Sequence, residues 1–439
     1  MNQWTLHASK SVREQFPNLF ASAMLWLACV AYLFYLGMPA FVAQMAADWH
    51  YTASQQGLIA MAEVTGNAVG ALSLAFLIRG RTALVTFACG LLVLVAGNAA
   101  MLAEPPFWLA YGERTFAGIG GGIVAGTSVR YLSLDSRSDT LLPLMVFCQY
   151  LGMLLLTSVV AHWMGSIGAS LAMCAVLPAL SLCILWFFKD GSQVAGEAAY
   201  GQGSAVHSGA AWLVLASMLF LYASAGVTWT FLESVGIASG IAQNQLGMAI
   251  GAAGLPAGVA CLCMPMLLRR GWTVPSGAAF LGLCAAGAAV LSTPLTPWTF
   301  AVGATAFFVG WTAGGIAQYA MLPTFDPVGR HIALIPACAG IGSAAGSLAG
   351  GYVIDSSSFS LAYEIAAAFA VLAVISLLAA NWLGSKRRTL GPSRFAACWT
   401  SKSIVARADR GGDPRRRSVA HPPEITLSTA FKETERHAP

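Results

Sequence analysis

Long apolar stretches follow one another along most of the chain and are separated by short polar breaks. Each is longer than the roughly 20 residues that a helix needs to cross the hydrocarbon core of a bilayer. Backbone polar groups in lipid must bond within their own segment, so such stretches predict transmembrane helices. We expect twelve spans: 19–46, 55–78, 82–103, 107–131, 140–163, 167–188, 209–235, 243–268, 272–293, 297–322, 331–354 and 360–383.

The gaps between the spans carry helix breakers such as Pro105-Pro106 and Asp326-Pro327. The longest gap, 189–208, is rich in Gly, Ser and Ala and follows the sixth span, where a linker between two halves belongs. We therefore expect an all-α integral membrane protein. Its parts are a six-helix half over 1–188, a cytoplasmic linker over 189–208, a second half over 209–384 and a tail over 385–439.

Composition supports a membrane protein. Hydrophobic residues make up 57% of the chain and charged residues 9%, whereas a soluble domain carries about 25% charged residues. The net charge of +5 comes from the tail, which holds twelve Lys and Arg against five acidic residues. The tail is polar and has no periodicity, so we expect disorder there rather than a nucleic-acid-binding domain.

Lys and Arg at the ends of the spans and in the loops fall on alternate sides, which sets the orientation by the positive-inside rule. They are Lys10, Arg13, Arg79, Arg81, Arg130, Arg137, Lys189, Arg269, Arg270, Arg330, Lys386, Arg387 and Arg388. The intervening loops contain none. This alternation predicts that both termini are cytoplasmic and that the protein lies in the inner (plasma) membrane.

The two predicted halves match each other at a spacing of 190 residues. The matching pairs are Tyr32 with Tyr222, Phe41 with Phe231, Gln55 with Gln245, Gly57 with Gly247, and Arg79 with Arg269. An even number of spans separates the copies, so the two repeats are parallel. Transporters built from such repeats place the substrate site near the midplane, between the halves.

The fourth span opens with the sequence R-T-F-A-G-I-G-G-G, Arg114 to Gly122. With this motif the chain resembles the major facilitator superfamily, over residues 10 to about 388. In that family the fourth-helix Arg is often linked to proton coupling. The family's loop after the second helix is only partly matched, because Gly80 and Arg81 fit but Leu77 stands at the acidic position. The Asp326–Arg330 loop also resembles bacterial members.

Charged residues in the cytoplasmic loops suggest a gate. We expect Asp135 to pair with Arg79 or Arg81, and Asp326 to pair with Arg269 or Arg270, with Arg330 nearby. Solvated pairs of this kind contribute about 0–1 kcal/mol each, so they would bias the outward-facing state rather than lock it.

Three of the polar residues inside the predicted spans of the first half are grouped by depth: Glu63 and Asn67 in span 2 and Arg114 in span 4. Glu63 and Arg114 lie at nearly the same depth from the outer side, about 12 Å at 1.5 Å per residue. We expect them to pair, with Glu63 exchanging protons and Asn67, one turn away, adding a hydrogen bond. The alternative is a fixed ion pair that only ties two helices together.

Two further acidic residues, Glu113 and Glu233, each fit two roles. Glu113 points about 100° away from Arg114, so it either serves a substrate cation or proton, or reaches toward the outer interface. Glu233, at the outer end of span 7, stands where the repeat has Ala43, and so it either faces substrate or lies at the interface.

Aromatic and amide side chains are candidates for lining a cavity. The candidates are Tyr32, Tyr35, Gln149, Tyr222, Trp229, Gln318 and Tyr319. Stacking surfaces beside one or two charges suit a flat organic substrate or a cation. The alternatives are lipid-facing aromatic belts and hydrogen bonds between helices.

Several chemistries have no matching motif. The sequence has no phosphate-binding loop, C-x-x-C pair, histidine cluster or hydrolase motif, so we expect no cofactor, no metal and no enzymatic activity. The sequence predicts a monomeric secondary transporter of a small organic molecule, proton-coupled, with efflux favoured. The alternatives are an organic-anion uptake permease, with Arg114 binding a carboxylate, and a non-transporting membrane sensor or assembly subunit.

Overall fold

The structure is a computed structural model of the 439-residue chain. It describes residues 17–77, 83–163, 166–188, 208–326 and 331–388. Nearly all of the predicted linker 189–208 and most of the predicted tail lie outside these residues. The described residues before Arg387 belong to one compact unit.

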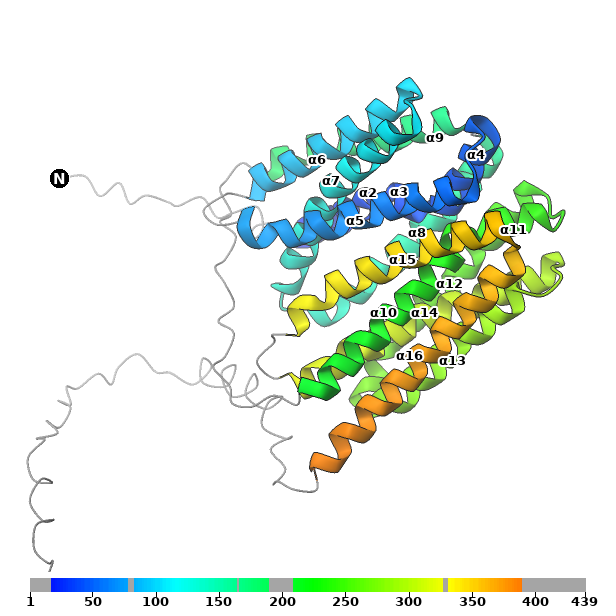
Figure 1. The fold of residues 1–439 in the computed structure, drawn as a ribbon. Coiled ribbons are helices and arrows are strands. Elements are labelled where there is room, and N and C mark those ends of the chain that lie inside the picture. The colour runs from blue at the N-terminus through cyan, green and yellow to red at the C-terminus, as the bar shows by residue number, and fades with distance from the viewer. Residues whose placement is uncertain (1–16, 78–82, 164–165, 189–207, 327–330, 389–439) are drawn as a thin grey trace, which may run out of the picture. The chain divides into compact units, whose positions relative to one another are not determined.

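All regular structure in the described residues is helical, and Figure 1 shows the helices arranged in two groups. The amino-terminal helices are α2 (Pro17–Ala31), α3 (Leu33–Leu36), α4 (Met38–Trp49), α5 (Ala53–Leu77), α6 (Ala83–Ala100), η1 (Met101–Ala103), α7 (Phe107–Ser133), α8 (Ser138–Trp163), α9 (Ile167–Ser181) and η2 (Leu182–Phe188).

The carboxyl-terminal helices form the green-to-orange group in Figure 1. They are α10 (Ser208–Thr230), α11 (Leu232–Ala238), α12 (Gln243–Arg269), α13 (Thr273–Leu291), α14 (Pro297–Phe325), η3 (Ile332–Leu334), α15 (Ile335–Ser356) and α16 (Phe359–Arg388).

Each predicted span coincides with helix in the described residues, and ten helices are long and apolar enough to cross a membrane. The first predicted span and α7 do not meet these criteria. The helix of the first span is interrupted twice, and α7 carries charged and glycine residues. An all-helical membrane fold is therefore confirmed, whereas the number twelve stays a prediction.

The first predicted span is three helices rather than one, and Pro39 explains the second break. A proline has no N–H and its ring clashes with the carbonyl four residues earlier, so a regular helix cannot continue through it. The chain leaves helical geometry at Gly37, and Pro39 lies in the first turn of α4. Consequently the carbonyl of Tyr35 has no helical N–H donor at residue 39.

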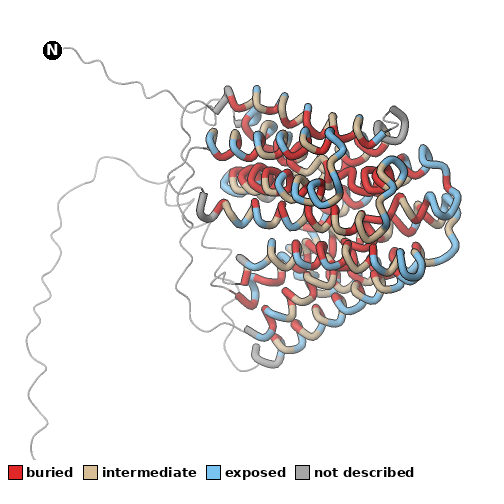
Figure 2. Tube along the Cα trace, turned by 45° about the horizontal axis from the view of Figure 1, so that its top comes forward, coloured by how far each residue is buried: buried red, intermediate tan, exposed pale blue. Residues whose placement is uncertain are grey.

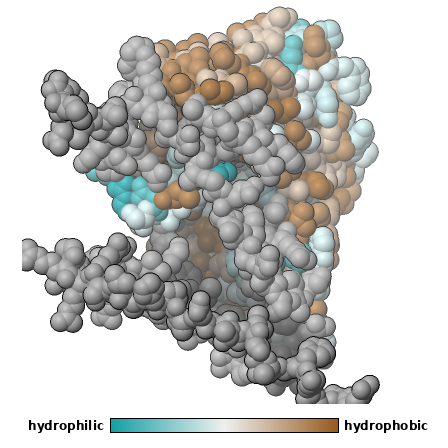
Figure 3. All heavy atoms as spheres, turned by 90° about the vertical axis from the view of Figure 1, so that its left-hand side faces the viewer, coloured by the Kyte–Doolittle hydropathy of each residue, from teal (hydrophilic) through white to brown (hydrophobic). Residues whose placement is uncertain are grey.

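Figure 2 shows buried residues on the helix faces that pack against one another. Many large apolar side chains are exposed on the outer faces, among them Leu155, Leu180, Met248 and Ile375. In water such a surface would be costly, but in lipid it faces an apolar solvent. In Figure 3, which looks at the end where α5 and α16 finish, hydrophobic side chains cover much of the coloured surface.

The 190-residue spacing found in the sequence recurs in the packing of two helix pairs, α6 on α7 and α13 on α14. Glycines at equivalent positions touch equivalent neighbours: Gly97 lies on Ala117 as Gly287 lies on Phe307, and Gly120 lies on Gly90 and Leu94 as Gly310 lies on Phe280 and Cys284. A Cβ at any of these glycines would overlap the neighbouring helix. The two groups therefore share one packing register.

Two helix pairs join the amino-terminal helices to the carboxyl-terminal ones, α5 with α15 and α8 with α12. Small residues allow close approach in both pairs. A Cβ at Gly57 would overlap the carbonyl oxygen of Ser347, and one at Gly251 would overlap Leu154. These pairs frame the space in which the site lies.

Candidate functional site

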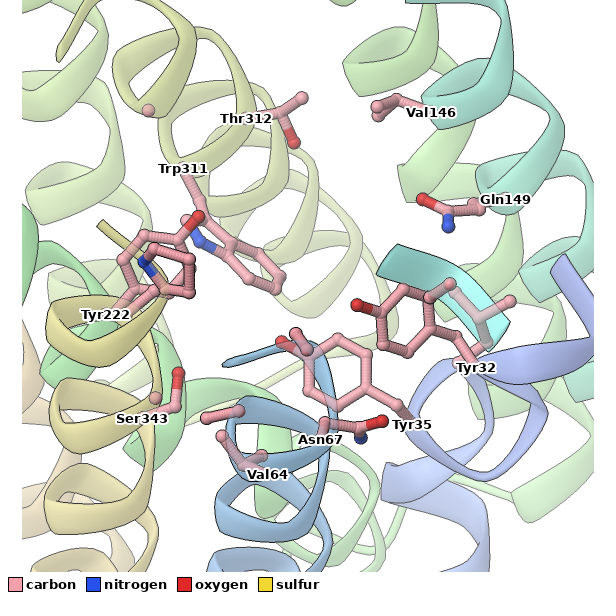
Figure 4. A pocket seen from close by; sticks show the side chains of 18 of the residues that line it. Tyr32, Tyr35, Val64, Asn67, Val146, Gln149, Tyr222, Trp311, Thr312 and Ser343 are labelled. Atoms are coloured by element: carbon pink, nitrogen blue, oxygen red, sulfur yellow. The ribbon is translucent and has the colours of Figure 1, made fainter. Parts of the chain in front are cut away.

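A cavity of about 530 Å³ lies between the amino-terminal and carboxyl-terminal helices. Its volume is in the range of pockets that hold small organic molecules, roughly 300–1,000 Å³. The lining side chains that Figure 4 labels are Tyr32, Tyr35, Val64, Asn67, Val146, Gln149, Tyr222, Trp311, Thr312 and Ser343. Tyr150, Trp229, Phe308 and Tyr319 also line it.

The cavity extends toward the end of the bundle where α5 finishes. Its lining residues run from Tyr35 and Trp229 to Val129 near the end of α7 and Ile335 at the start of α15. Val129 is exposed, whereas Trp229 is buried. The opposite end, where α5 begins and α15 finishes, is held together by direct contacts.

At that closed end, the Asp355 carboxylate of α15 accepts hydrogen bonds from the start of α5. The backbone N–H groups of Ala53 and Ser54 donate to its two oxygens at 2.9 and 2.8 Å. The first N–H groups of a helix have no partner within the helix, so a carboxylate there is well placed to bind them. Gly351 packs on the Ala53 carbonyl beside this contact.

A second contact between the two groups lies deeper, at the break before α4. The Trp229 indole N–H of α10 donates to the Tyr35 carbonyl at 2.9 Å. This is the carbonyl that Pro39 leaves without a helical donor. The proline therefore creates an acceptor in the amino-terminal helices, and a tryptophan from the carboxyl-terminal helices satisfies it.

Behind the cavity wall lies a buried polar cluster centred on Glu63 and Arg114. Arg114 Nη1 is 3.5 Å from Glu63 Oε2, and the two side chains are 0% and 1% exposed respectively. Arg114 also donates to Asn98 Oδ1 at 2.8 Å and lies 4.2 Å from the ring centroid of Phe34. Asn67 donates to Glu63 Oε1 at 3.2 Å.

The cluster is incompletely satisfied. Glu63 Oε2 and the Nε and Nη1 atoms of Arg114 are buried and form no hydrogen bond to a described residue. An ion pair in a low dielectric is stable only when its remaining donors and acceptors are bonded. The pair is neutral when Glu63 is ionised and carries a positive charge when Glu63 is protonated.

The fourth-helix glycines place Arg114 beside Glu63. Gly118 and Gly122 lie on the carbonyl oxygens of Glu63 and Asn67, and a Cβ at either glycine would overlap them. Gly121 leaves room for the Asn67 side chain in the same way. The glycine motif therefore lets α7 approach α5 closely at the residues that form the polar cluster.

The structure brings together most of the candidate site residues predicted from the sequence. Tyr32, Tyr35, Asn67, Gln149, Tyr222, Trp229 and Tyr319 line the cavity. Glu63 and Arg114 pair with each other as expected, but neither lines the cavity. Asn67 belongs to both, since it lines the cavity and bonds to Glu63.

Three candidates lie elsewhere. Gln318 is buried and donates to Ser217 Oγ at 2.7 Å, which is a bond between helices rather than a ligand contact. Glu233 is buried and accepts from Gln243 at 3.2 Å. Neither lines the cavity, and of the two roles expected for Glu233 its position favours the one that does not contact substrate.

Glu113 is half-buried near the end of the bundle that Asp355 closes, and it does not line the cavity. It lies near Tyr51, in the loop between α4 and α5. Burial raises the pKa of Tyr51, and the negative charge of Glu113 adds to this effect. The position favours the interfacial interpretation of Glu113.

The predicted gate is only partly described, because Arg79, Arg81 and Arg330 lie outside the described residues. Asp135 pairs with Arg137 in its own loop at 3.1 Å, and these bonds raise the pKa of Arg137.

Asp326 is buried and accepts hydrogen bonds from the backbone of His331 and Ile332. Its expected pair with Arg269 or Arg270 stays a prediction.

Five residues of the site were not predicted from the sequence: Asn98, Tyr150, Phe308, Trp311 and Thr312. Asn98 is a polar residue inside an apolar span, which is the same signal that identified Glu63 and Asn67. Trp311 and Thr312 lie two turns before Tyr319 in α14, and only the packing of α14 against the cavity reveals their role. Among the described residues, no group of three His, Cys, Asp or Glu side chains could hold a metal ion.

Solved structures of transporters share this fold. A mutant of the nucleoside transporter NupG has a TM-score of 0.69 at 12% identity, covering 82% of this chain and 99% of its own. Unmodified NupG has a TM-score of 0.67 at 14% identity, covering 83% and 98%. A structure from work on proton dependent oligopeptide transporters has 0.63 at 13%, covering 85% and 99%.

No protein-family model and no curated protein matches the chain. At these identities the structural likeness shows the fold alone. That fold is the one shared by major facilitator transporters, which confirms the resemblance indicated by the Arg114 motif.

Proposed function

We propose, from the premise of its major facilitator fold, that this protein is a secondary active transporter of a small organic molecule. Transport proceeds by alternating access between two parallel six-helix halves, 1–188 and 209–384, and is coupled to protons. The observation that carries the proposal is the cavity between the two helix groups, closed at one end and backed by the buried Glu63–Arg114 pair.

The shared packing register supports the two halves. α6 and α7 pack in the same register as α13 and α14, 190 residues later, as expected for a repeated unit that moves as a body. The closed end then corresponds to the outer side and the exposed end to the cytoplasm, by the distribution of Lys and Arg. The conformation is inward-facing on this assignment.

The outward-facing conformation requires the closed end to open. Opening would separate α5 from α15 and so break the bonds of Asp355 to Ala53 and Ser54. It would also break the bond between Trp229 and the Tyr35 carbonyl. These are three hydrogen bonds, and a single bond of this kind contributes only about 0.5–1.5 kcal/mol to stability.

Proton coupling is assigned to Glu63. A carboxylate inside a membrane protein is costly unless it is paired, and such residues commonly serve proton relays. Glu63 has a single ionic partner among the described residues, and its Oε2 accepts no hydrogen bond from them. Protonation would release Arg114 from the pair, and Asn67 would carry the change to the cavity.

We favour efflux, since the cavity lining is aromatic and largely apolar. The organic-anion alternative required Arg114 to bind a carboxylate. Arg114 is fully buried and is engaged by Glu63, Asn98 and Phe34, which disfavours that role.

The test is transport by the purified full-length protein in proteoliposomes with an imposed pH gradient. A panel of small organic molecules would be screened for accumulation that stops when an uncoupler collapses the gradient. A transporter shows such accumulation for at least one compound. Binding without transport or exchange of any bound compound would contradict the proposal and favour a membrane sensor.

A further inference from the structure

We infer that the cavity binds an uncharged, planar ring compound that carries hydrogen-bonding groups. The inference rests on the proposed function, since it takes the cavity as the transport site. The sequence predicts a flat organic molecule or a cation as the substrate. The inference narrows this class to uncharged ring compounds.

The first observation is charge. None of the described lining residues has a carboxylate, ammonium, guanidinium or imidazole group. Glu63 and Arg114 lie behind the wall and compensate each other. A charged substrate would therefore be desolvated without a counter-charge among these residues, which is costly in a low dielectric.

The second observation is shape. Aromatic rings face the cavity from both helix groups, Tyr32 and Tyr35 from one side and Tyr222 and Trp311 from the other (Figure 4). Tyr32 and Tyr35 have ring centroids 6.0 Å apart, and Tyr222 and Trp311 have centroids 6.3 Å apart. Aromatic rings on two sides favour a flat ring, which can contact both.

The third observation is an amide in the lining. Gln149 lines the cavity and donates to the Ala28 carbonyl at a long 3.4 Å. This amide is therefore available to bind the polar edge of a ring, and it does not require that ring to be charged. Asn67 also lines the cavity, but its Oδ1 is itself buried and its Nδ2 donates to Glu63.

The experiment is binding to the full-length protein in detergent, without a gradient, measured by thermal shift and calorimetry. One matched series shares a pyridine ring: nicotinamide is neutral, nicotinate is an anion and 3-picolylamine is a cation. A second series shares an indole ring: indole-3-acetamide, indole-3-acetate and tryptamine. Uridine adds a larger neutral ring compound, and glucose is a neutral compound without an aromatic ring.

We expect a neutral ring compound to bind at least ten-fold more tightly than its charged counterparts, and glucose to bind no more tightly than those. The inference is overturned if a charged member binds as tightly as the neutral one, or if no neutral ring compound in the panel binds.

Two variants make the test independent of folding defects. Gln149→Glu introduces a carboxylate into the lining and should bring the cations, 3-picolylamine and tryptamine, up to at least the affinity of the neutral compounds. Trp311→Ala should weaken neutral binding at least ten-fold, whereas Trp298→Ala, at an exposed position outside the cavity, should not. Unchanged selectivity in Gln149→Glu would contradict the inference.

The outcome is separable from that of the proposed function. Selective binding of neutral rings without gradient-driven movement of any of them would leave the substrate class intact and overturn the transporter. Gradient-driven movement of only charged compounds would support the transporter and overturn the inferred substrate class.

Discussion

The amino-terminal helices hold Glu63, Asn67, Asn98 and Arg114 at four buried positions. At the equivalent positions 190 residues later, the carboxyl-terminal helices hold Ala253, Ala257, Ala288 and Ala304, and all four alanines are buried. The glycine contacts between α6 and α7 nevertheless recur between α13 and α14, whereas Phe308, Trp311 and Thr312 stand where α7 has Gly118, Gly121 and Gly122. One repeated scaffold therefore encloses a polar cluster on one side of the cavity and alanines at the equivalent positions on the other.

This difference separates what helix packing requires from what the polar cluster is needed for. Close packing of the helices needs small residues and is met in both groups. The polar cluster is not needed for the packing of α6 on α7, since α13 and α14 pack in the same register with alanines in place of Asn98 and Arg114. A buried ion pair that the scaffold can replace by alanine is better explained by function than by stability.

The largest expected effect comes from breaking the ion pair on one side. Arg114→Ala leaves the Glu63 carboxylate buried without its partner, which costs about 3–5 kcal/mol in comparable cases. We expect loss of proton-driven transport and a clearly lower unfolding temperature in detergent.

The control for that variant is the double change Glu63→Ala and Arg114→Ala, which makes the amino-terminal core resemble the carboxyl-terminal one. It should recover much of the lost stability because no uncompensated charge remains, while transport stays uncoupled. Stability that falls further in the double variant would contradict a functional role for the pair.

Next in size is the close approach of α7 to α5. Gly122→Ala places a Cβ against the Asn67 carbonyl and should cost about 1–3 kcal/mol through overpacking, together with most of the transport activity. Gly112→Ala on the same helix meets nothing within 4 Å and should be tolerated. Equal losses of stability and transport in the two variants would mean that the change in helix propensity causes them, rather than the overlap with Asn67.

The shared register predicts a matched pair of effects. Gly120→Ala and Gly310→Ala push apart equivalent helix pairs, so thermal unfolding should show similar destabilisation, about 1–3 kcal/mol each. A large cost at only one of the two would show that the halves are not packed alike.

A smaller effect is expected at the closed end. Asp355→Ala removes two acceptors of the α5 amides and should weaken the seal by about 1–3 kcal/mol. Hydrogen exchange at Ala53 and Ser54 should then be faster by at least several-fold. Ser356→Ala, whose hydroxyl bonds to its own helix, serves as the control and should leave exchange unchanged.

Much of the fold could be predicted from the sequence because lipid imposes simple rules. Segment length, loop charge and the 190-residue repeat each depend on local residues, and they located the helices to within a few positions. The break at Gly37 was missed, although Pro39 signals it, since hydropathy alone does not register a missing N–H.

The site was predictable where polarity stands out from an apolar background, as at Glu63, Asn67 and Arg114. Exposure to the cavity was not, because it depends on helix rotation and on partners distant in sequence. Gln318 and Gln149 are both amides inside spans, yet one bonds to Ser217 in another helix and the other lines the cavity. Only the packing of the helices distinguishes the two.

The most direct test asks which half couples transport to protons. Uptake into proteoliposomes of a compound that binds in the cavity would be compared for wild type, Glu63→Gln and Glu233→Gln, with and without a pH gradient. Glu233 is the comparison because it is a buried carboxylate of the carboxyl-terminal helices that lies away from the cavity. We predict that Glu63→Gln loses gradient-driven accumulation but keeps substrate exchange, and that Glu233→Gln keeps both. Gradient-driven accumulation that survives in Glu63→Gln and fails in Glu233→Gln would contradict the account.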